Sequence, residues 1–456
     1  MRAITVYDTF RGAEVELEPR AAGKVGIYAC GPTVYAPIHV GNARPFVTFA
    51  VFKRFLEHEG YDVTLVVNIT DVNDKIYDAA RERGVASESL VAEMTERYLS
   101  DTDGLGLGRP DHEPRAAQSI EAIVVLIEAL IASDHAYAVA GDVYFRVRSF
   151  PAYGRLSNRA LEDMVQAEGD EARVDIKESP QDFALWKARK PGEDTAWPSP
   201  WGEGRPGWHI ECSAMAEGIL GTDFDIHGGG IDLVFPHHEN EIAQTEAGRD
   251  ERLARVWMHN GMVRLADEKM SKSLGNIQPL AEALERHGRD AIVMWLLSGH
   301  YRRPLAFTDE IVGDAGRSVE RIREFCGRLH RFAPPPDALA PYSERFFAAL
   351  ADDFNTPVAR SALFDWVAEG NRRLDSGERL GVGELGTMLD VIGFAHLVDG
   401  EGEAPPPEAE RLAAEREAAR AARDFATADR KRDELTALGW EVRDGAEGSR
   451  LVPLQR

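Results

Sequence analysis

The chain is poor in cysteine and in long apolar runs. Only three of its 456 residues are cysteine, namely Cys30, Cys212 and Cys326. So sparse and odd a set of thiols argues against a disulfide framework and indicates a reducing compartment. No run of about 18 uncharged apolar residues occurs, and the amino terminus lacks the apolar segment of a signal peptide. We therefore expect a cytoplasmic protein without a membrane span.

Basic residues are scarce as well. The chain has 53 Lys and Arg against 77 Asp and Glu, a formal net charge of −24. Contacts to nucleic-acid phosphates need Lys and Arg, so this balance argues against a broad nucleic-acid-binding surface. Residues 411–456, however, carry 10 basic and 9 acidic residues, so the acidity belongs to the rest of the chain. An RNA partner would have to use local patches, and indiscriminate binding is discouraged.

The length indicates several domains, and the first of them has an α/β pattern. Residues 24–30 and 62–69 are apolar and rich in β-branched side chains, as in buried strands. Between them, residues 46–59 show helical spacing of phenylalanines and end before Gly60. Strand, helix and strand at this spacing predict a parallel sheet with a ligand at the carboxyl ends of its strands. Residues 224–234 and 256–264 add further strands.

Composition changes mark the later segments. Residues 117–205 read as an insertion with a helix over 120–131 and a strand over 143–147. From residue 307 the chain turns helical. Residues 401–407 (EGEAPPP) are an acidic, proline-rich linker, and a short helical unit rich in Ala, Arg and Glu closes the chain.

Four possible metal ligands are scattered over the sequence. Cys30 ends the first predicted strand, Cys212 stands far downstream, and His237 and Glu241 share one face of a helix because they are four residues apart. Thiolate, imidazole and carboxylate ligands together suit zinc. A free cysteine is also commonly a small buried hydrophobe, so the pattern alone leaves both interpretations open.

Two short strings carry groups that can hold a triphosphate. His39-Val40-Gly41-Asn42 and Lys269-Met270-Ser271-Lys272-Ser273 each place hydrogen-bonding or cationic side chains beside glycine or short polar residues. Each string alone is a weak signal, because a lysine pair in a polar loop is more often a solvated surface.

Together with further motifs, these strings resemble those of cysteinyl-tRNA synthetases, a family of class I aminoacyl-tRNA synthetases. The resemblance covers nearly the whole chain, and Asn42, where the class signature has a second histidine, is usual in this family. The motifs run in the family's order: CGPTVY (30–35), HVGNARPF (39–46), NITDVNDKI (68–76), GWHIECSAM (207–215), FDIHGGG (224–230), PHHENEIAQ (236–244) and EKMSKSLGN (268–276).

The resemblance implies an α/β fold in which a Rossmann-type parallel-sheet catalytic domain with an insertion precedes a helical bundle and a small carboxyl-terminal domain. The implied boundaries are a catalytic domain with a zinc site over 1–116 and 206–265, a connective insertion over 117–205, a KMSKS loop and stem-contact region over 266–306, a helical bundle on the anticodon side over 307–400, and a linker with a small anticodon-binding domain over 401–456.

It also implies a zinc ion that binds the thiolate of the substrate. The implied zinc ligands are Cys30, Cys212, His237 and Glu241, and the residues that line the cysteine pocket are Thr70, Trp208, His227 and Asp232. A shape-based pocket discriminates cysteine from serine poorly, whereas a soft metal does so strongly, and an editing site is then unnecessary. From the residues alone, Trp208 also fits core packing, and Thr70 also fits the cap of the following turn.

For ATP, the resemblance implies contacts from both signatures. These residues are His39, Gly41, Asn42, Lys269, Ser271 and Lys272, and the catalytic ones are His39, Asn42, Lys269 and Lys272. The implied reaction activates L-cysteine with ATP-Mg²⁺ and transfers it to the 3′ end of tRNA(Cys), and the family habit predicts a monomer. Candidate phosphate contacts on the tRNA side are Arg302, Arg303, Arg317, Arg321 and Arg328, although an arginine stripe also fits a solvated face.

Two rival functions stay open at this point. The cysteine ligase of mycothiol biosynthesis shares the zinc site and forms the same adenylate, but it transfers cysteine to an amino sugar-inositol and lacks the carboxyl-terminal domain that residues 411–456 supply. A non-catalytic zinc protein that binds RNA would be expected to lose the phosphate-gripping residues, yet His39, Lys269 and Lys272 are all present.

Overall fold

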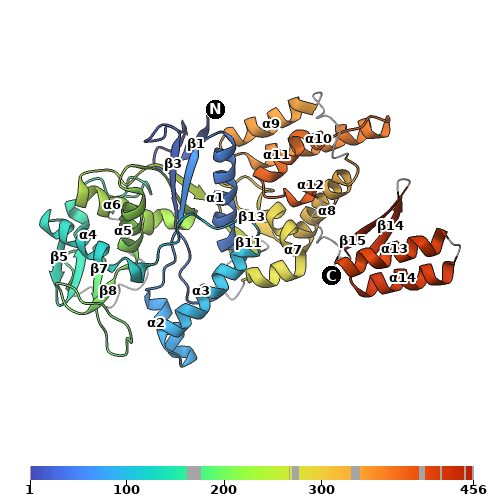
Figure 1. Cartoon of the computed structure of the whole chain (residues 1–456). Helices are drawn as coiled ribbons and strands as arrows, with labels where there is room; N and C mark the ends of the chain where they lie inside the picture. Colours follow the sequence, from blue (N-terminus) through green and yellow to red (C-terminus); the bar gives the residue numbers. More distant parts are fainter. Residues whose placement is uncertain are drawn as a thin grey trace.

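The structure is a computed structural model, shown in Figure 1. It describes residues 2–161, 176–265, 268–269, 277–329, 339–399, 406–421, 424–445 and 448–453.

Four parallel strands form the central sheet, in the order β10-β9-β3-β4. The predicted strand–helix–strand unit is confirmed: β3 (Lys24–Ala29) and β4 (Asp62–Val67) are neighbours joined through α1 (Val40–His58). On the other edge of β3 lie β9 (Phe224–Gly230) and then β10 (Ala254–Asn260). Because all four strands run the same way, their carboxyl ends meet at one edge.

Both faces of this sheet are buried, as its nearly continuous apolar strands require. Alternate residues of β3 point to opposite sides: Val25 and Ile27 pack in a core with α1, and Tyr28 packs in a second core with α5 (Trp208–Leu220). α6 (Glu239–Arg249) lies against α5.

α1 packs tightly on the sheet. It begins after His39, and most of its residues are buried. A Cβ atom built on Gly228 of β9 would lie 2.0 Å from the Phe49 ring of α1. Glycine at this position therefore sets how close the helix comes to the sheet.

The predicted strand over 224–234 is too long at its carboxyl end. β9 stops at Gly230, and the chain continues through a 3₁₀ turn (Ile231–Leu233) and a π-helical turn (Val234–His238) into α6. The run Ile-Asp-Leu-Val-Phe is typical of a strand by composition, but it lies past the carboxyl end of the sheet, where none of the described strands pairs with it.

The insertion forms a separate antiparallel sheet in the order β5-β6-β7-β8. Its core includes Phe183 and Trp186 and is covered by α4 (Ile120–Ala132). The strands are β5 (Ala136–Val139), β6 (Asp142–Phe145), β7 (Phe183–Ala188) and β8 (Gly204–Pro206).

Further elements from the part of the chain up to Phe307 surround the central sheet (Figure 1). They are the hairpin β1 (Thr5–Asp8) and β2 (Ala13–Glu16), the helices α2 (Asp74–Arg83), α3 (Ser87–Asp103) and α7 (Leu280–Leu296), and a small sheet of β11 (Val263–Leu265), β12 (Glu268–Lys269) and β13 (Leu305–Phe307).

After β13 the described chain is helical up to the carboxyl-terminal module. The bundle consists of α8 (Asp309–Cys326), α9 (Ala340–Ala351), α10 (Thr356–Asp375), α11 (Gly383–Val391) and α12 (His396–Asp399). The module has its own small core and consists of α13 (Pro407–Ala421), α14 (Phe425–Ala437), β14 (Trp440–Gly445) and β15 (Gly448–Pro453). Among the helices of the described residues, none is both long and apolar enough to cross a membrane.

The Gly228–Phe49 contact gives a stability prediction. We expect Gly228→Ala to destabilise the protein by about 1–3 kcal/mol, because the added methyl group overpacks the helix–sheet interface. The thermal midpoint should fall by several degrees, and Phe49→Leu in the same chain should restore part of the loss. Gly218→Ala is the matched control, since nothing lies within 4 Å of its Cβ position on α5. An unchanged midpoint for Gly228→Ala would show that α1 adjusts without cost.

Candidate functional site

A cavity of about 590 Å³ opens at the carboxyl edge of the central sheet. Nine of the residues singled out from the sequence line it: Cys30, His39, Gly41, Asn42, Thr70, Trp208, Cys212, Asp232 and His237. Seven of them come from loops and helix ends that follow β3, β4 and β9, which is where a parallel sheet presents its ligands. Trp208 and Cys212 come from α5.

The four possible metal ligands meet at one end of this cavity. Their ligand atoms all lie within 4.8 Å of one another, and all four residues are buried. Cys30 follows β3, Cys212 lies on α5, His237 on the π-helical turn and Glu241 on α6. Residues separated by up to 211 positions thus form one site, which we call the Cys/His/Glu cluster, and it can hold a metal ion.

The distances within the cluster are short enough for its atoms to share one ion. The Sγ atoms of Cys30 and Cys212 are 3.8 Å apart, far beyond the length of about 2.05 Å that a disulfide bond requires. Oε1 of Glu241 lies 3.6 Å from the Cys30 Sγ and 3.0 Å from Nε2 of His237.

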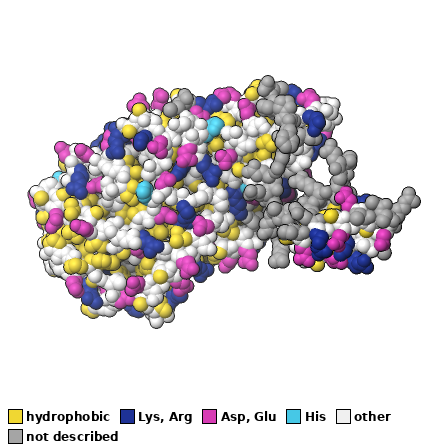
Figure 2. Space-filling model, viewed as in Figure 1, with side chains coloured by type: hydrophobic (Ala, Val, Ile, Leu, Met, Phe, Trp, Pro, Cys, Tyr) yellow, Lys and Arg dark blue, Asp and Glu magenta, His cyan; other side chains and the backbone are white. Residues whose placement is uncertain are grey.

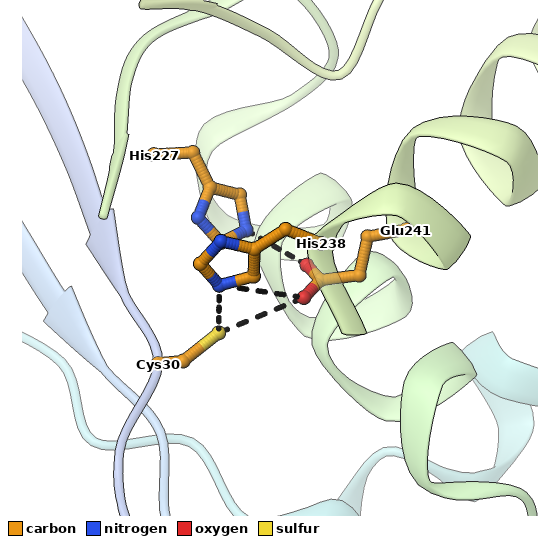
Figure 3. A group of neighbouring side chains, drawn as sticks. All are labelled: Cys30, His227, His238 and Glu241. Atoms are coloured by element: carbon orange, nitrogen blue, oxygen red, sulfur yellow. Dashed lines mark hydrogen bonds and ion pairs between the residues drawn. The ribbon is translucent and has the colours of Figure 1, made fainter. Parts of the chain in front are cut away.

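A second layer of histidines surrounds the cluster, partly shown in Figure 3. Nε2 of His227 is 2.7 Å from Oε2 of Glu241, and Nε2 of His238 is 3.3 Å from the Cys30 Sγ. Cys30, His227, His238 and Glu241 therefore form an overlapping group that could also hold a metal. The ring of His238 is bonded in turn to His259, at 2.8 Å. Such outer partners fix the orientation of ligands.

Burial sets the protonation of these groups in the absence of a cation. Loss of solvation, followed by the neighbouring Cys212 thiol, raises the pKa of Cys30 well above its usual range. Burial lowers the pKa of His237 to about 3, so its imidazole is neutral at physiological pH. A neutral imidazole is ready to bind a metal, whereas the thiols must lose their protons to do so.

The residues predicted to contact cysteine surround the cluster in different ways. Trp208 stacks on the His237 ring at 4.3 Å and lines the cavity. Thr70 also lines it and accepts a hydrogen bond from Asn68 at 3.1 Å, while the cap of α2 is Asn73 rather than Thr70. Asp232, on the 3₁₀ turn after β9, also lines the cavity.

His227 has a different setting from these three. It is fully buried, does not belong to the lining of the cavity, and contacts the carboxylate of Glu241. Its direct contact with a substrate stays a prediction.

The other end of the cavity is the amino terminus of α1. Nδ1 of His39 accepts a hydrogen bond from the Gly41 N–H at 3.1 Å, and Oδ1 of Asn42 accepts one from the His39 N–H at 3.1 Å. The two side chains form a reciprocal helix cap, a structural role for Asn42 that the sequence did not indicate. A Cβ on Gly41 would lie 2.8 Å from the His39 ring, so glycine is needed for this geometry.

The second signature is only partly within the described residues. Val263 lines the cavity and begins β11, which pairs with β12, where Lys269 lies opposite Arg264. Ser271 and Lys272 lie outside the described residues, so their predicted roles rest on the sequence.

The structure adds residues that the sequence analysis did not single out. Lys75, from NITDVNDKI, and Tyr35 line the cavity, and His238 and His259 support the cluster. The pair His237-His238 was a visible signal for the outer layer, but nothing in the sequence places His259 beside it.

Four of the five arginines predicted to contact tRNA have intramolecular partners. Arg302 pairs with Asp353, Arg317 with Asp314 and Arg328 with Asp375. Arg321 lies over the ring of Phe364.

Comparison with known proteins identifies the family. Residues 16–317 match the model described as "tRNA synthetases class I (C) catalytic domain", and residues 345–393 match the DALR domain. The chain is 46% identical to the cysteine–tRNA ligase of Halorhodospira halophila, over 98% of this chain and 99% of that one. It is 44% identical to the cysteine–tRNA ligase of Symbiobacterium thermophilum, with the same coverage.

Solved structures show the same fold at low identity. Mycobacterium tuberculosis methionyl-tRNA synthetase with methionyl-adenylate superposes with a TM-score of 0.59 at 16% identity, over 82% of this chain and 88% of that chain. A leucyl-tRNA synthetase of Agrobacterium radiobacter in a ternary complex gives 0.61 at 12% identity, over 84% and 85%. The expected α/β synthetase fold is confirmed, and the chain belongs to the cysteine–tRNA ligase family of class I tRNA synthetases.

Proposed function

We propose that this chain activates L-cysteine with ATP and transfers the cysteinyl group to the 3′ end of tRNA(Cys). One observation carries the proposal: a single cavity has the Cys/His/Glu cluster at one end and the capped amino terminus of α1 at the other. A metal that binds thiols and a helix terminus that binds phosphates would bring cysteine and ATP together. Membership of the family supplies the reaction class.

We infer that the metal of the cluster is zinc. In a tetrahedral zinc site with Zn–S bonds of about 2.3 Å, two sulfurs are about 3.8 Å apart, and a sulfur and a carboxylate oxygen about 3.6 Å. The corresponding distances here are 3.8 Å for Cys30 and Cys212 and 3.6 Å for Cys30 and Glu241. Zinc held by Cys30, Cys212, His237 and Glu241 would bind the thiolate of the substrate and favour it strongly over the hydroxyl of serine.

The proposed reaction has two steps, activation of cysteine and its transfer to tRNA. An oxygen of the cysteine carboxylate attacks the α-phosphorus of ATP, the bond to the bridging oxygen breaks, and pyrophosphate leaves. A ribose hydroxyl of the terminal tRNA adenosine then attacks the carbonyl of cysteinyl-adenylate, loses its proton, and AMP leaves. Both steps depend on positioning and on neutralising phosphate charge.

His39 is set to donate to the phosphates. Its Nδ1 accepts the Gly41 N–H, so in the neutral ring the proton is on Nε2, where it is a donor. Asn42 holds the His39 backbone. Lys269 and Lys272, with Ser271, would grip the pyrophosphate, and Mg²⁺ would enter with ATP.

The later domains would bind the body of the tRNA. We propose that the division stated from the sequence holds, with the bundle over 307–400 and the module over 401–456 on the anticodon side. Figure 2 shows Lys and Arg interspersed with Asp and Glu over the visible face, with basic side chains also on the module. A mixed surface of this kind discourages indiscriminate binding of nucleic acid, and we propose a monomer that acts in the cytoplasm.

The acceptor assay tests the proposed function. With ATP, Mg²⁺ and labelled cysteine, label should become acid-precipitable with bulk tRNA. Transfer only to an amino sugar-inositol would make the chain a ligase of the mycothiol type. Absence of cysteine-dependent pyrophosphate exchange would leave a non-catalytic RNA-binding protein.

A matched pair of cysteine variants tests the zinc site. Cys212→Ser should lower zinc affinity by more than the roughly 10- to 100-fold that loss of an outer partner costs, and should abolish cysteine activation, because it removes a thiolate ligand. Cys326→Ser is the control, since that cysteine lies on α8 and outside the cluster. Zinc measured by mass spectrometry after dialysis reports the result. Equal zinc contents in the two variants would contradict the assignment.

The phosphate role of His39 can be separated from its role as a helix cap. Asn is a preferred capping residue, so His39→Asn should leave the thermal midpoint nearly unchanged. The asparagine side chain lacks the imidazole Nε2–H donor, so kcat for pyrophosphate exchange should fall by roughly 10²- to 10³-fold. His39→Ala should lose both activity and stability. A His39→Asn protein with wild-type kcat would exclude the imidazole from the phosphate contact.

A further inference from the structure

Arg44 of α1 is a buried arginine, and it is 1% exposed. No carboxylate among the described residues pairs with it. Burial lowers its pKa to about 10, so it remains a cation at neutral pH. Burying an unpaired charge is costly, and such a group is normally held in place by several hydrogen bonds.

All the hydrogen bonds of Arg44 go to backbone carbonyls. Nη1 donates to the carbonyls of Gly261 at 2.7 Å and Met262 at 3.2 Å. Nη2 donates to those of His300 at 3.0 Å and Arg303 at 2.5 Å. The fork of one guanidinium thus joins three segments: α1, the chain between β10 and β11, and the loop after α7.

The first pair of carbonyls belongs to the wall of the substrate cavity. Gly261, Met262 and Val263 line it, next to His39 and Gly41. The wall leads straight into β11, which pairs with the strand that carries Lys269. Both phosphate-binding signatures therefore adjoin the segment that Arg44 holds.

The loop over 300–303 is pressed against this wall. The Gly261 N–H donates to the Tyr301 carbonyl at 2.7 Å, and a Cβ on Gly261 would lie 2.4 Å from the Arg303 carbonyl oxygen. The loop is anchored from the bundle side as well, since the Tyr301 hydroxyl donates to Asp353 at 2.7 Å. The two backbones thus meet closely at Gly261, and the Arg44 guanidinium bridges them.

We propose that Arg44 is a positioning residue for the adenylate step, which holds the wall of residues 261–262 at the spacing from α1 that the nucleotide of ATP requires. This inference rests on the proposed function, in which the α1 end of the cavity takes ATP. It differs from a metal or phosphate contact, because Arg44 acts through the backbone it holds and does not touch the reacting atoms. Displacing catalytic groups by about 1 Å can cost about 100-fold in rate, so the arrangement is sensitive to this residue.

Pyrophosphate exchange with each substrate varied in turn tests the proposal. Arg44→Met keeps the length of the side chain and removes every donor; we expect KM for ATP to rise about 10- to 100-fold, with KM for cysteine and zinc content within twofold of the wild type. Arg44→Lys should be intermediate, because one ammonium cannot span four carbonyls. Arg54→Met is the control, on the same helix but paired with Asp390.

A second variant reaches the same wall without changing Arg44. Gly261→Ala forces the wall away from the Arg303 carbonyl and should also raise KM for ATP selectively. If Arg44→Met does not fold, Gly261→Ala and Arg44→Lys together test the proposed role of Arg44. Unchanged KM for ATP in folded variants, or equal rises for ATP and cysteine, would overturn the proposal. A wild type without cysteine-dependent exchange would instead overturn the proposed function.

Discussion

The packing of two thiols, an imidazole and a carboxylate in one buried cluster is the constraint on which the rest of the site depends. Each of these groups loses its hydration there, and burial raises the pKa of the Cys30 thiol well above its usual range, so a cation beside it would favour the thiolate. The parallel sheet brings them together: Cys30 follows β3, the chain after β9 turns back with His237 and Glu241, and α5 supplies Cys212. With the proposed zinc ion in the cluster, selection between cysteine and serine would follow from the softness of the metal rather than from shape.

Much of the architecture could be predicted from local sequence, because it depends on local chemistry. The sequence predicts a parallel pair from the apolar strands β3 and β4 and the phenylalanine-rich helix between them, and the structure contains that pair. The strand prediction was wrong for residues 231–234, because an apolar run does not indicate whether a neighbouring strand exists. Their helical turns are set by the end of the sheet at Gly230.

The candidate site was predictable to a different degree. Spacing could pair His237 with Glu241 on one helix face, but only the fold brings Cys30 and Cys212 beside them, and the resemblance to a family supplied that set in advance. The cap formed by Asn42 is a local contact with His39, three residues away. The outer histidines and the carbonyls around Arg44 instead depend on tertiary contacts between distant segments. No periodicity or motif encodes such contacts, which is why they appear only with the structure.

Helix α1 relates the two ends of the cavity to each other. Its cap, His39, lies at the proposed nucleotide end, Arg44 holds the segment of residues 261–262, and Phe49 rests on Gly228, whose carbonyl accepts the Cys30 N–H at 3.0 Å beside the Cys/His/Glu cluster. Ten residues of α1 thus span from the proposed phosphate contact to the strand next to Cys30, about 15 Å at 1.5 Å per residue. In-line attack of a carboxylate on a phosphorus requires both substrates in fixed register. A buried helix that touches both ends can fix that register, whereas loops joined only through solvent-exposed contacts could not.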